Sequence, residues 1–163
     1  MISILKPGKS SYTEAKAYRP ICLSFLLKTV ERLVDRHIGD GVLGRNPLNI
    51  NQNAYQSGIS TDAALNAVVS TIEKALKTKE IAMRAFLDIE GAFGRTSMEA
   101  ISSALLRHGV PPLFERWIAF MLSSICIISS LMGEAMQVAG VRGCPLGGVL
   151  SPLLWTLTAD ELI

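Results

Sequence analysis

The sequence has little of what marks a secreted protein or a metal-cluster protein. Its 163 residues include only three cysteines and two histidines, without the spacing of zinc ligands. The odd set Cys22, Cys126 and Cys144 favours reduced, mostly buried thiols in an intracellular protein, in the nucleus or the cytoplasm. The first residues lack a basic segment followed by an apolar one, so we expect no secretion signal.

Uncharged runs of membrane-spanning length are also lacking. The runs 117–133 and 143–159 fall just short of the roughly 18–20 apolar residues that a spanning helix needs. Serines interrupt the first run, and glycines and prolines interrupt the second. Buried core segments explain both runs better, and we expect no membrane partner. A small membrane protein with two short spans is the alternative.

The composition that is present describes one globular domain. Hydrophobic residues make up 49% of the chain and charged residues 18%, which is enough apolar material to bury a core. The net charge is only +2, but it is unevenly distributed: residues 1–59 hold an excess of Lys and Arg, whereas residues 60–163 hold an excess of Asp and Glu. This asymmetry fits a module that grips a polyanion beside one that binds a metal.

Hydrophobic residues recur at helical spacing in two segments, 24–38 and 61–79. We expect Ser24 to cap the first helix and Gly39 to end it, and a serine or threonine to cap the second. The expected inward-facing residues are Leu23, Leu26, Leu27, Val30, Leu33, Val34 and Ile38 in the first helix, and Leu65, Val68, Val69, Ile72, Ala75 and Leu76 in the second.

The second half of the chain predicts strands as well as helices. The apolar run 81–89 predicts a central strand that carries Asp88 near its end. The further elements are a helix opened by the capping-box spacing of Thr96–Glu99 and ended by Gly109, a helix started by Pro111 and Pro112, a hairpin of strands over 125–132 and 135–141, and a helix capped by Ser151. Expected to face inward are Ile101, Leu105, Leu106, Leu113, Trp117, Phe120 and Met121, while Asp160 and Glu161 form a solvated end.

Two segments carry the chemistry. The stretch 85–94 delivers Asp88 and then breaks into Gly-Ala-aromatic; by itself it favours a solvated strand-end aspartate over a Mg²⁺ ligand. The stretch 142–155 is rich in glycine and proline, so that its backbone can be approached closely by a ligand, and it leads into a helix. The alternative for this second stretch is a plain turn before a helix.

In this order, and some fifty residues apart, the two segments resemble motifs A and B of reverse transcriptases, closely those of non-LTR (LINE-like) retrotransposons. Further similarity lies in the Lys-Pro-Gly-Lys block at 6–9, the Tyr-Arg-Pro-Ile block at 18–21 and the block at 51–62. The resemblance implies an α+β fold, the fingers and partial palm of a right-hand polymerase, with helices packed on a small antiparallel sheet. Residues 1–80 would form the fingers-like segment and residues 81–163 the partial palm.

The resemblance also implies RNA-directed DNA synthesis by two-metal nucleotidyl transfer, with an RNA template, a DNA primer, deoxynucleoside triphosphates and two Mg²⁺ ions. Asp88 would be the catalytic carboxylate that holds both ions, and the main-chain carbonyl of Ile89 would complete the shell of one ion. Phe93 would exclude a ribose 2′-hydroxyl. The remaining implied site residues are Pro145, Leu146, Gly147 and Gly148 for the nucleotide, and Lys6, Lys9 and Arg19 for template or triphosphate phosphates.

The chain departs from the family pattern at several of these places. Gln56 and Ile59 stand where the family commonly has Arg or Lys, Gly94 where it has Asp or Asn, and Leu146 where it has Gln. The third motif, aromatic-x-Asp-Asp, does not occur before Ile163. We therefore expect a truncated reverse transcriptase fragment that does not polymerise alone. A non-catalytic nucleic-acid-binding remnant is the alternative.

Overall fold

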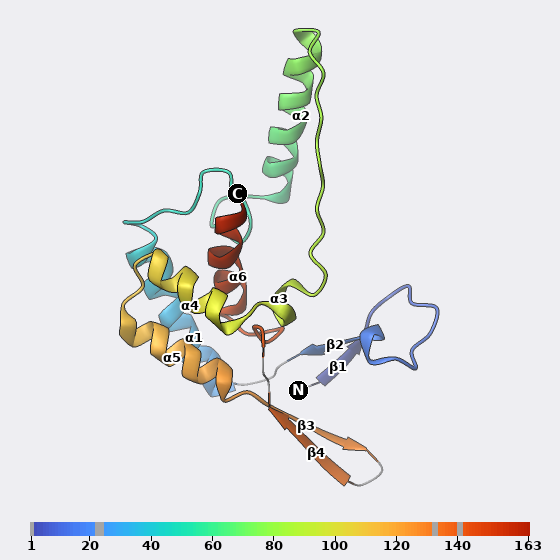
Figure 1. Cartoon of the computed structure of the whole chain (residues 1–163), viewed down its shortest axis with the longest axis vertical. Helices are drawn as coiled ribbons and strands as arrows, with labels where there is room; N and C mark the ends of the chain where they lie inside the picture. Colours follow the sequence, from blue (N-terminus) through green and yellow to red (C-terminus); the bar gives the residue numbers. More distant parts are fainter. Residues whose placement is uncertain (1, 22–24, 132–133, 140–141) are drawn as a thin grey trace.

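A computed structural model of the chain describes residues 2–21, 25–131, 134–139 and 142–163 (Figure 1). The α-helices are α1 (Phe25–Arg36), α2 (Thr61–Lys77), α3 (Ala92–Arg95), α4 (Met98–Arg107), α5 (Pro112–Ser123) and α6 (Ser151–Ala159). Shorter helical turns are η1 (Ala15–Ala17), η2 (His37–Val42) and η3 (Asp160–Leu162). Two antiparallel hairpins pair β1 (Ile2–Leu5) with β2 (Tyr18–Ile21), and β3 (Cys126–Leu131) with β4 (Glu134–Ala139).

The described core is formed by helices packed against helices. Its buried side chains come from α1, η2, α4, α5, α6 and the loop segments beside them: Val34, Ile38, Val42, Ile101, Ala104, Leu105, Val110, Ile118, Met121, Leu122, Cys144, Leu150, Leu154 and Leu157. The protein is thus mostly helical with small antiparallel sheets. The expected packing of helices on a sheet is not found in this core, because the strands form separate hairpins beside the helices (Figure 1).

Helix α1 buries a narrower stripe than its sequence predicts. Val34 and Ile38 are buried, but Leu26, Val30 and Leu33 are exposed, because only one line of the helix faces α6 and its neighbours. Leu23 and the expected cap Ser24 lie outside the described residues. The predicted stop at Gly39 is wrong: the helix widens into the π-helical turn η2, which continues to Val42.

A buried carboxylate joins α1 to α6. Glu31 lies on the inward line of α1 and is 3% exposed. Its Oε2 atom accepts hydrogen bonds from the backbone N–H groups of Val149 and Leu150, at 2.5 Å and 3.0 Å. These N–H groups precede the first turn of α6, where a helix has unpaired donors and favours negative charge. Glu31 therefore acts as a capping carboxylate supplied from another helix.

Ser151, the predicted N-cap of α6, has another role. Leu150 is the N-cap residue, and the Ser151 hydroxyl donates to the carbonyl oxygen of Pro145 at 2.7 Å. The helix itself and its first-turn proline, Pro152, are confirmed.

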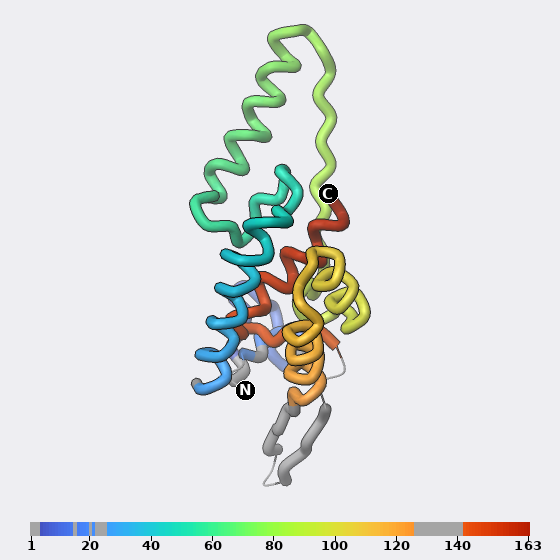
Figure 2. Tube along the Cα trace, turned by 90° about the vertical axis from the view of Figure 1, so that its left-hand side faces the viewer, coloured from blue at the N-terminus to red at the C-terminus, as the bar shows by residue number. Residues whose placement is uncertain are grey.

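Helix α2 forms where it is predicted but does not pack as predicted. The Ser60 hydroxyl caps it by accepting from the N–H of Ala63 at 3.1 Å. No residue of α2 is buried, so the expected core stripe is wrong: Leu65, Val69 and Leu76 are all exposed. Figures 1 and 2 show α2 and the segment that follows it projecting as an arm from the rest of the chain.

The predicted strand over 81–89 does not form. Every residue of this segment is exposed, and none belongs to a strand. A strand needs a neighbour for its backbone N–H and C=O groups, and the described strands pair only within their own hairpins.

Helices α4 and α5 begin within one residue of where the sequence predicts. The cap of α4 lies one residue later than the Thr96–Glu99 spacing predicts: the Ser97 hydroxyl accepts from the N–H of Ala100 at 3.1 Å, whereas the Thr96 hydroxyl donates to the carbonyl oxygen of Ala92 at 2.6 Å. Of the residues expected to face inward, Ile101, Leu105 and Met121 are buried, but Leu106, Leu113 and Phe120 are exposed because they lie on the outer sides of their helices. The hairpin predicted over 125–132 and 135–141 is also confirmed as β3–β4, and positions 132, 140 and 141 of those ranges lie outside the described residues.

The expected solvated end at Asp160 is wrong. The side chains of His108 and Asp160 are 8% and 12% exposed, with His108 Nε2 3.6 Å from Asp160 Oδ2. Asp160 also accepts from the backbone N–H of Asn49 at 2.9 Å, and Asn46 donates to the carbonyl oxygen of His108 at 3.0 Å. This cluster ties the end of α4 to the loop after η2 and to the start of η3.

Within the described residues, none of the helices has the length and apolar character needed to cross a membrane.

The Glu31 cap leads to a stability prediction. Glu31→Ala should lower the free energy of unfolding by about 2–4 kcal/mol, because the buried N–H of Leu150 and the part-buried N–H of Val149 lose their acceptor. Glu31→Gln should cost about half as much, since it keeps one acceptor oxygen. Urea unfolding followed by circular dichroism measures both. Glu73→Ala, at an exposed position of α2, is the matched control. Equal midpoints for Glu31→Ala and the control would contradict the capping role.

The His108 cluster leads to a pH prediction. Burial lowers the pKa of His108, and the negative charge of Asp160 only partly offsets that effect. The folded chain therefore binds this proton less readily than the unfolded chain, so its contribution to stability is complete above about pH 6.5 and declines as the pH falls below that value. At fixed protein concentration, the melting temperature should drop from pH 7.5 to pH 5.5. His108→Asn should flatten this dependence, and an unchanged slope in the variant would refute the assignment.

Candidate functional site

The glycine-rich segment 142–148 forms a tight turn in front of α6. The N–H of Gly148 donates to the carbonyl oxygen of Pro145 at 3.0 Å, with Leu146 and Gly147 between them. Gly147 has φ +90°, a conformation that favours glycine. A Cβ atom on Gly148 would lie 2.7 Å from the Ser151 hydroxyl oxygen. The turn therefore brings its backbone close to neighbouring atoms of the chain. Leu146 lies between Gly143 and Gly147 and is exposed.

This turn packs directly on the residues that follow Asp88. The N–H of Gly143 donates to the carbonyl oxygen of Thr96 at 3.0 Å, and the N–H of Cys144 donates to that of Phe93 at 2.7 Å. Gly143 has φ +82°, and a Cβ atom there would lie only 2.5 Å from the Phe93 oxygen. Only glycine fits this position. The structure therefore brings together the two segments that the sequence singled out.

Cys144 fixes this contact and is chemically inert. Its side chain is buried, and burial raises the pKa of the thiol to about 12. It stays protonated at neutral pH, so it is neither a nucleophile nor a metal-binding thiolate.

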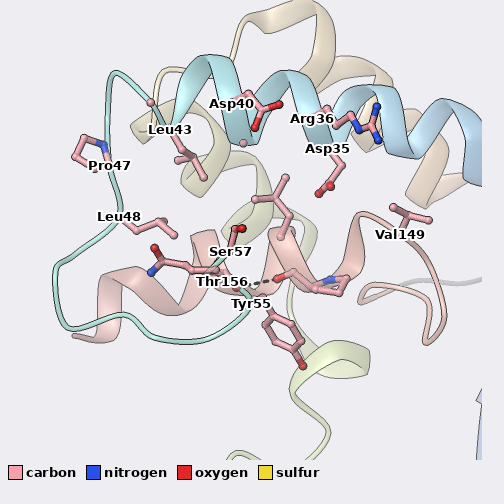
Figure 3. Close-up of a pocket in the computed structure, with 15 residues that line it drawn as sticks. Asp35, Arg36, Asp40, Leu43, Pro47, Leu48, Tyr55, Ser57, Val149 and Thr156 are labelled. Carbon is pink, nitrogen blue, oxygen red and sulfur yellow. Dashed lines mark hydrogen bonds between the residues drawn. The ribbon is translucent and has the colours of Figure 1, made fainter. Parts of the chain in front are cut away.

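Phe93 lies in an aromatic group beside the turn. Its ring centroid is 6.1 Å from that of Trp155 and 6.3 Å from that of Tyr55. Phe93 and Trp155 are half-buried, whereas Tyr55 is exposed and extends toward α3 (Figure 3). The three rings come from separate parts of the chain and give the site an apolar wall next to polar backbone. Tyr55 is a member that the sequence analysis did not single out as a site residue.

Asp88 and Ile89 lie in the exposed segment immediately before this wall. Gly91, at φ +68°, turns the chain from the segment into α3. The ion pair in this region joins Arg95 and Glu90 at 3.3 Å, and both side chains are exposed. Across the residues that the structure describes, no group of three or more His, Cys, Asp or Glu side chains could hold a metal. One carboxylate and one carbonyl do not fit a two-ion site by themselves.

The predicted phosphate-binding cations share one hairpin. Arg19 lies on β2, paired with Ile4 of β1, and Lys6 and Lys9 lie in the connection that follows β1. Lys9 and Arg19 are exposed. The Lys6 ammonium donates to the carbonyl oxygen of Lys16 at 2.9 Å, which orders the hairpin as well as adding charge to it.

A pocket of about 650 Å³ lies between α1, η2, the loop at 43–57 and α6 (Figure 3). Its lining includes Asp35, Asp40, Tyr55, Gln56 and Thr156. Burial raises the pKa of the Asp35 carboxyl, and the negative charge of Asp40 adds to the increase. The sequence analysis did not predict this pocket, because its lining comes from three separate segments without a shared motif.

Comparisons with known proteins identify the family of the chain. A family model described as "Reverse transcriptase (RNA-dependent DNA polymerase)" matches residues 4–163. The chain is 28% identical over 162 residues to "Probable RNA-directed DNA polymerase from transposon BS" of Drosophila melanogaster. The matched region covers 98% of this chain and 18% of that protein. It is 30% identical over 165 residues to "RNA-directed DNA polymerase from mobile element jockey" of Drosophila funebris, with 98% and 18% coverage.

The chain is similar to a third relative, "Probable RNA-directed DNA polymerase from transposon X-element" of Drosophila melanogaster, at 29% identity over 163 residues, 98% of this chain and 18% of that protein. It spans less than a fifth of the length of these curated relatives. Because the family match covers nearly the whole chain, the protein belongs to the reverse transcriptase domain family of non-LTR retrotransposons.

Proposed function

We propose that this chain is the fingers and partial palm of a retrotransposon polymerase that copies RNA into DNA, with residues 1–80 on the fingers side and residues 81–163 on the palm side. The observation that carries the proposal is the packing of the Gly143–Gly148 turn on Phe93–Thr96. A polymerase must hold a nucleotide between a metal-binding edge and a surface that accepts its sugar and base. The turn and the aromatic wall are suited to supply such a surface, and Asp88 precedes Phe93 of that wall in the same segment of the chain.

The nucleotide-facing residues of the proposal are Phe93 and the turn from Pro145 to Gly148. The Phe93 ring is held by its aromatic neighbours, so it is suited to meet a deoxyribose and to exclude a 2′-hydroxyl. Gly147 and Gly148 let a backbone or a base come close. Leu146 offers an apolar side chain where the family resemblance implies a polar amide, so we expect this copy to hold the incoming nucleotide less tightly.

Asp88 and the Ile89 carbonyl are the proposed metal ligands, and Mg²⁺ is the proposed ion because hard divalent cations favour oxygen donors. Two such ions neutralise charge during nucleotidyl transfer in polymerases. The single carboxylate at this edge does not complete a two-ion site, so the 163 residues alone are proposed to be inactive.

The β1–β2 hairpin is the proposed contact to RNA template phosphates, through Lys6, Lys9 and Arg19. Two of these cations are exposed, and all three lie within one hairpin. Phosphate contacts of this kind carry little sequence information but depend strongly on salt. This part of the proposal also serves the second candidate function, a nucleic-acid-binding remnant without catalysis.

RNA binding tests the hairpin. Binding to a single-stranded RNA should weaken with salt at a log–log slope of about −2, as expected for three phosphate contacts to a single strand, which is about a twentyfold loss between 50 and 200 mM salt. Fluorescence anisotropy measures the slope. Replacing Lys6, Lys9 and Arg19 with Ala should bring it close to zero. The matched control replaces Lys74, Lys77 and Lys79 with Ala and should keep the wild-type slope. Equal slopes in the two triple variants would refute the assignment.

Primer extension tests the catalytic part. With an RNA template, a DNA primer, deoxynucleoside triphosphates and Mg²⁺, the 163-residue chain should give no extension product, because one carboxylate does not complete a two-ion site. Asp88→Asn is the matched variant and should show the same background. Product that forms with the wild type and disappears with Asp88→Asn would show that these residues suffice for catalysis.

A further inference from the structure

Tyr55 has a backbone conformation that bulky side chains disfavour. Its φ is +54°, in the left-handed region that residues other than glycine rarely adopt. Such a conformation persists only where the surrounding structure fixes it, and it is found most often at functional sites. Two features of the structure account for it here: the anchoring of the loop that carries Tyr55, and the contact that its ring makes.

A buried glutamine anchors this loop. Gln52 is 5% exposed, and its side-chain oxygen accepts from the backbone N–H of Ala54 at 3.1 Å. The side-chain amide of Gln56 donates to the carbonyl oxygen of Gln52, so hydrogen bonds hold the loop on both sides of Tyr55. The N–H of Gln52 donates to the carbonyl oxygen of Asn49 at 2.9 Å, and Asn49 is bonded in turn to the first residue of η3. The loop therefore fixes the backbone of Tyr55 in its left-handed conformation.

The ring of Tyr55 is directed at the ring of Phe93. The two centroids are 6.3 Å apart and the ring planes meet at 77°, an edge-to-face arrangement that aromatic pairs favour. Figure 3 shows the Tyr55 side chain extending away from the pocket and toward α3, the helix that contains Phe93. The anchored loop thus places one aromatic ring against another that lies 38 positions later in the sequence.

Phe93 has a fixed backbone, but its ring depends on neighbouring side chains. Its carbonyl oxygen accepts from the N–H of Cys144 at 2.7 Å, which holds the main chain against the glycine-rich turn. A phenylalanine on a fixed backbone still has several staggered rotamers open to it unless adjacent side chains fill the space. Tyr55 and Trp155, whose ring centroid is 6.1 Å from that of Phe93, restrict the ring from two separate segments.

We propose that Tyr55 is a positioning residue that sets the preference of this site for deoxynucleotides over ribonucleotides. The inference rests on the proposed function, in which the Phe93 ring excludes a ribose 2′-hydroxyl. The two kinds of nucleotide differ there by a single hydroxyl group, so a ring that can turn aside does not separate them. Tyr55 prevents this rotation through its ring, and it needs no contact with the nucleotide and no hydroxyl group to do so.

Binding of dATP and ATP measures the preference. The 163-residue chain is mixed with Mg²⁺ and an RNA template annealed to a DNA primer, with uracil as the next template base, and should bind dATP more tightly than ATP. Tyr55→Asn should lower the ratio of the two affinities about fivefold, because asparagine tolerates the left-handed backbone but removes the aromatic contact. Tyr55→Phe should keep the wild-type ratio, since it keeps the ring. Phe120→Ala, which removes an exposed ring of α5, is the matched control and should also keep it.

The NMR signals of the Phe93 ring test the contact without a nucleotide. An aromatic ring shifts the resonances of the protons beside it. The Phe93 ring protons should therefore move toward their random-coil positions in Tyr55→Asn and stay in place in Tyr55→Phe. Circular dichroism checks that every variant keeps its helices.

The outcomes separate this inference from the proposed function. A wild-type chain that does not bind dATP more tightly than ATP would overturn the proposed role of Phe93, and the inference with it. A wild-type chain that discriminates, together with a Tyr55→Asn variant that discriminates equally well, would overturn the inference alone. Unchanged Phe93 signals in Tyr55→Asn, or a Tyr55→Phe variant that loses the preference, would overturn it too.

Discussion

The absence of a side chain at Gly143 is the constraint on which the candidate site depends. At this position the backbone of the turn comes so close to Phe93 that a Cβ atom would stand 2.5 Å from its carbonyl oxygen. The space is filled by two backbone hydrogen bonds, from Gly143 to Thr96 and from Cys144 to Phe93. Two segments some fifty residues apart in the sequence are thereby held in contact, with Cys144 buried beside them.

The other side of the turn is held by charge. Glu31 reaches from α1 to the N–H groups of Val149 and Leu150, so the turn is fastened to α3 at one end and to α1 at the other. A carboxylate is suited to this place because the start of α6 presents unpaired donors and a positive dipole end. The helical core and the candidate site are therefore not separate features: the same backbone that closes the core also presents Leu146 and Gly147.

The sequence predicts local features of this structure better than its packing. The Ser60 cap of α2 and the β3–β4 hairpin follow from spacing and turn chemistry, and the cap of α4 falls at Ser97, one residue after the expected Thr96. Burial depends on which face meets a neighbour, which periodicity does not reveal. The apolar residues of α2 have the spacing of a core helix, but none of them is buried. The sequence suggests a solvated Asp160, whereas the fold places Asn49 and His108 beside it. The resemblance to motifs A and B pointed to these two segments as one site. Glu31 carried no local signal, and Tyr55 was noted only as part of the family-like block at 51–62.

The segment 81–89 shows why a strand pattern does not by itself make a strand. Alternation fixes which side chains share a face, but the backbone gains hydrogen bonds only when another strand is present. The described strands pair only within their own hairpins, so the segment that carries Asp88 stays exposed. The pattern therefore states which side chains share a face, whereas the burial of that face depends on a neighbouring strand that the pattern does not specify.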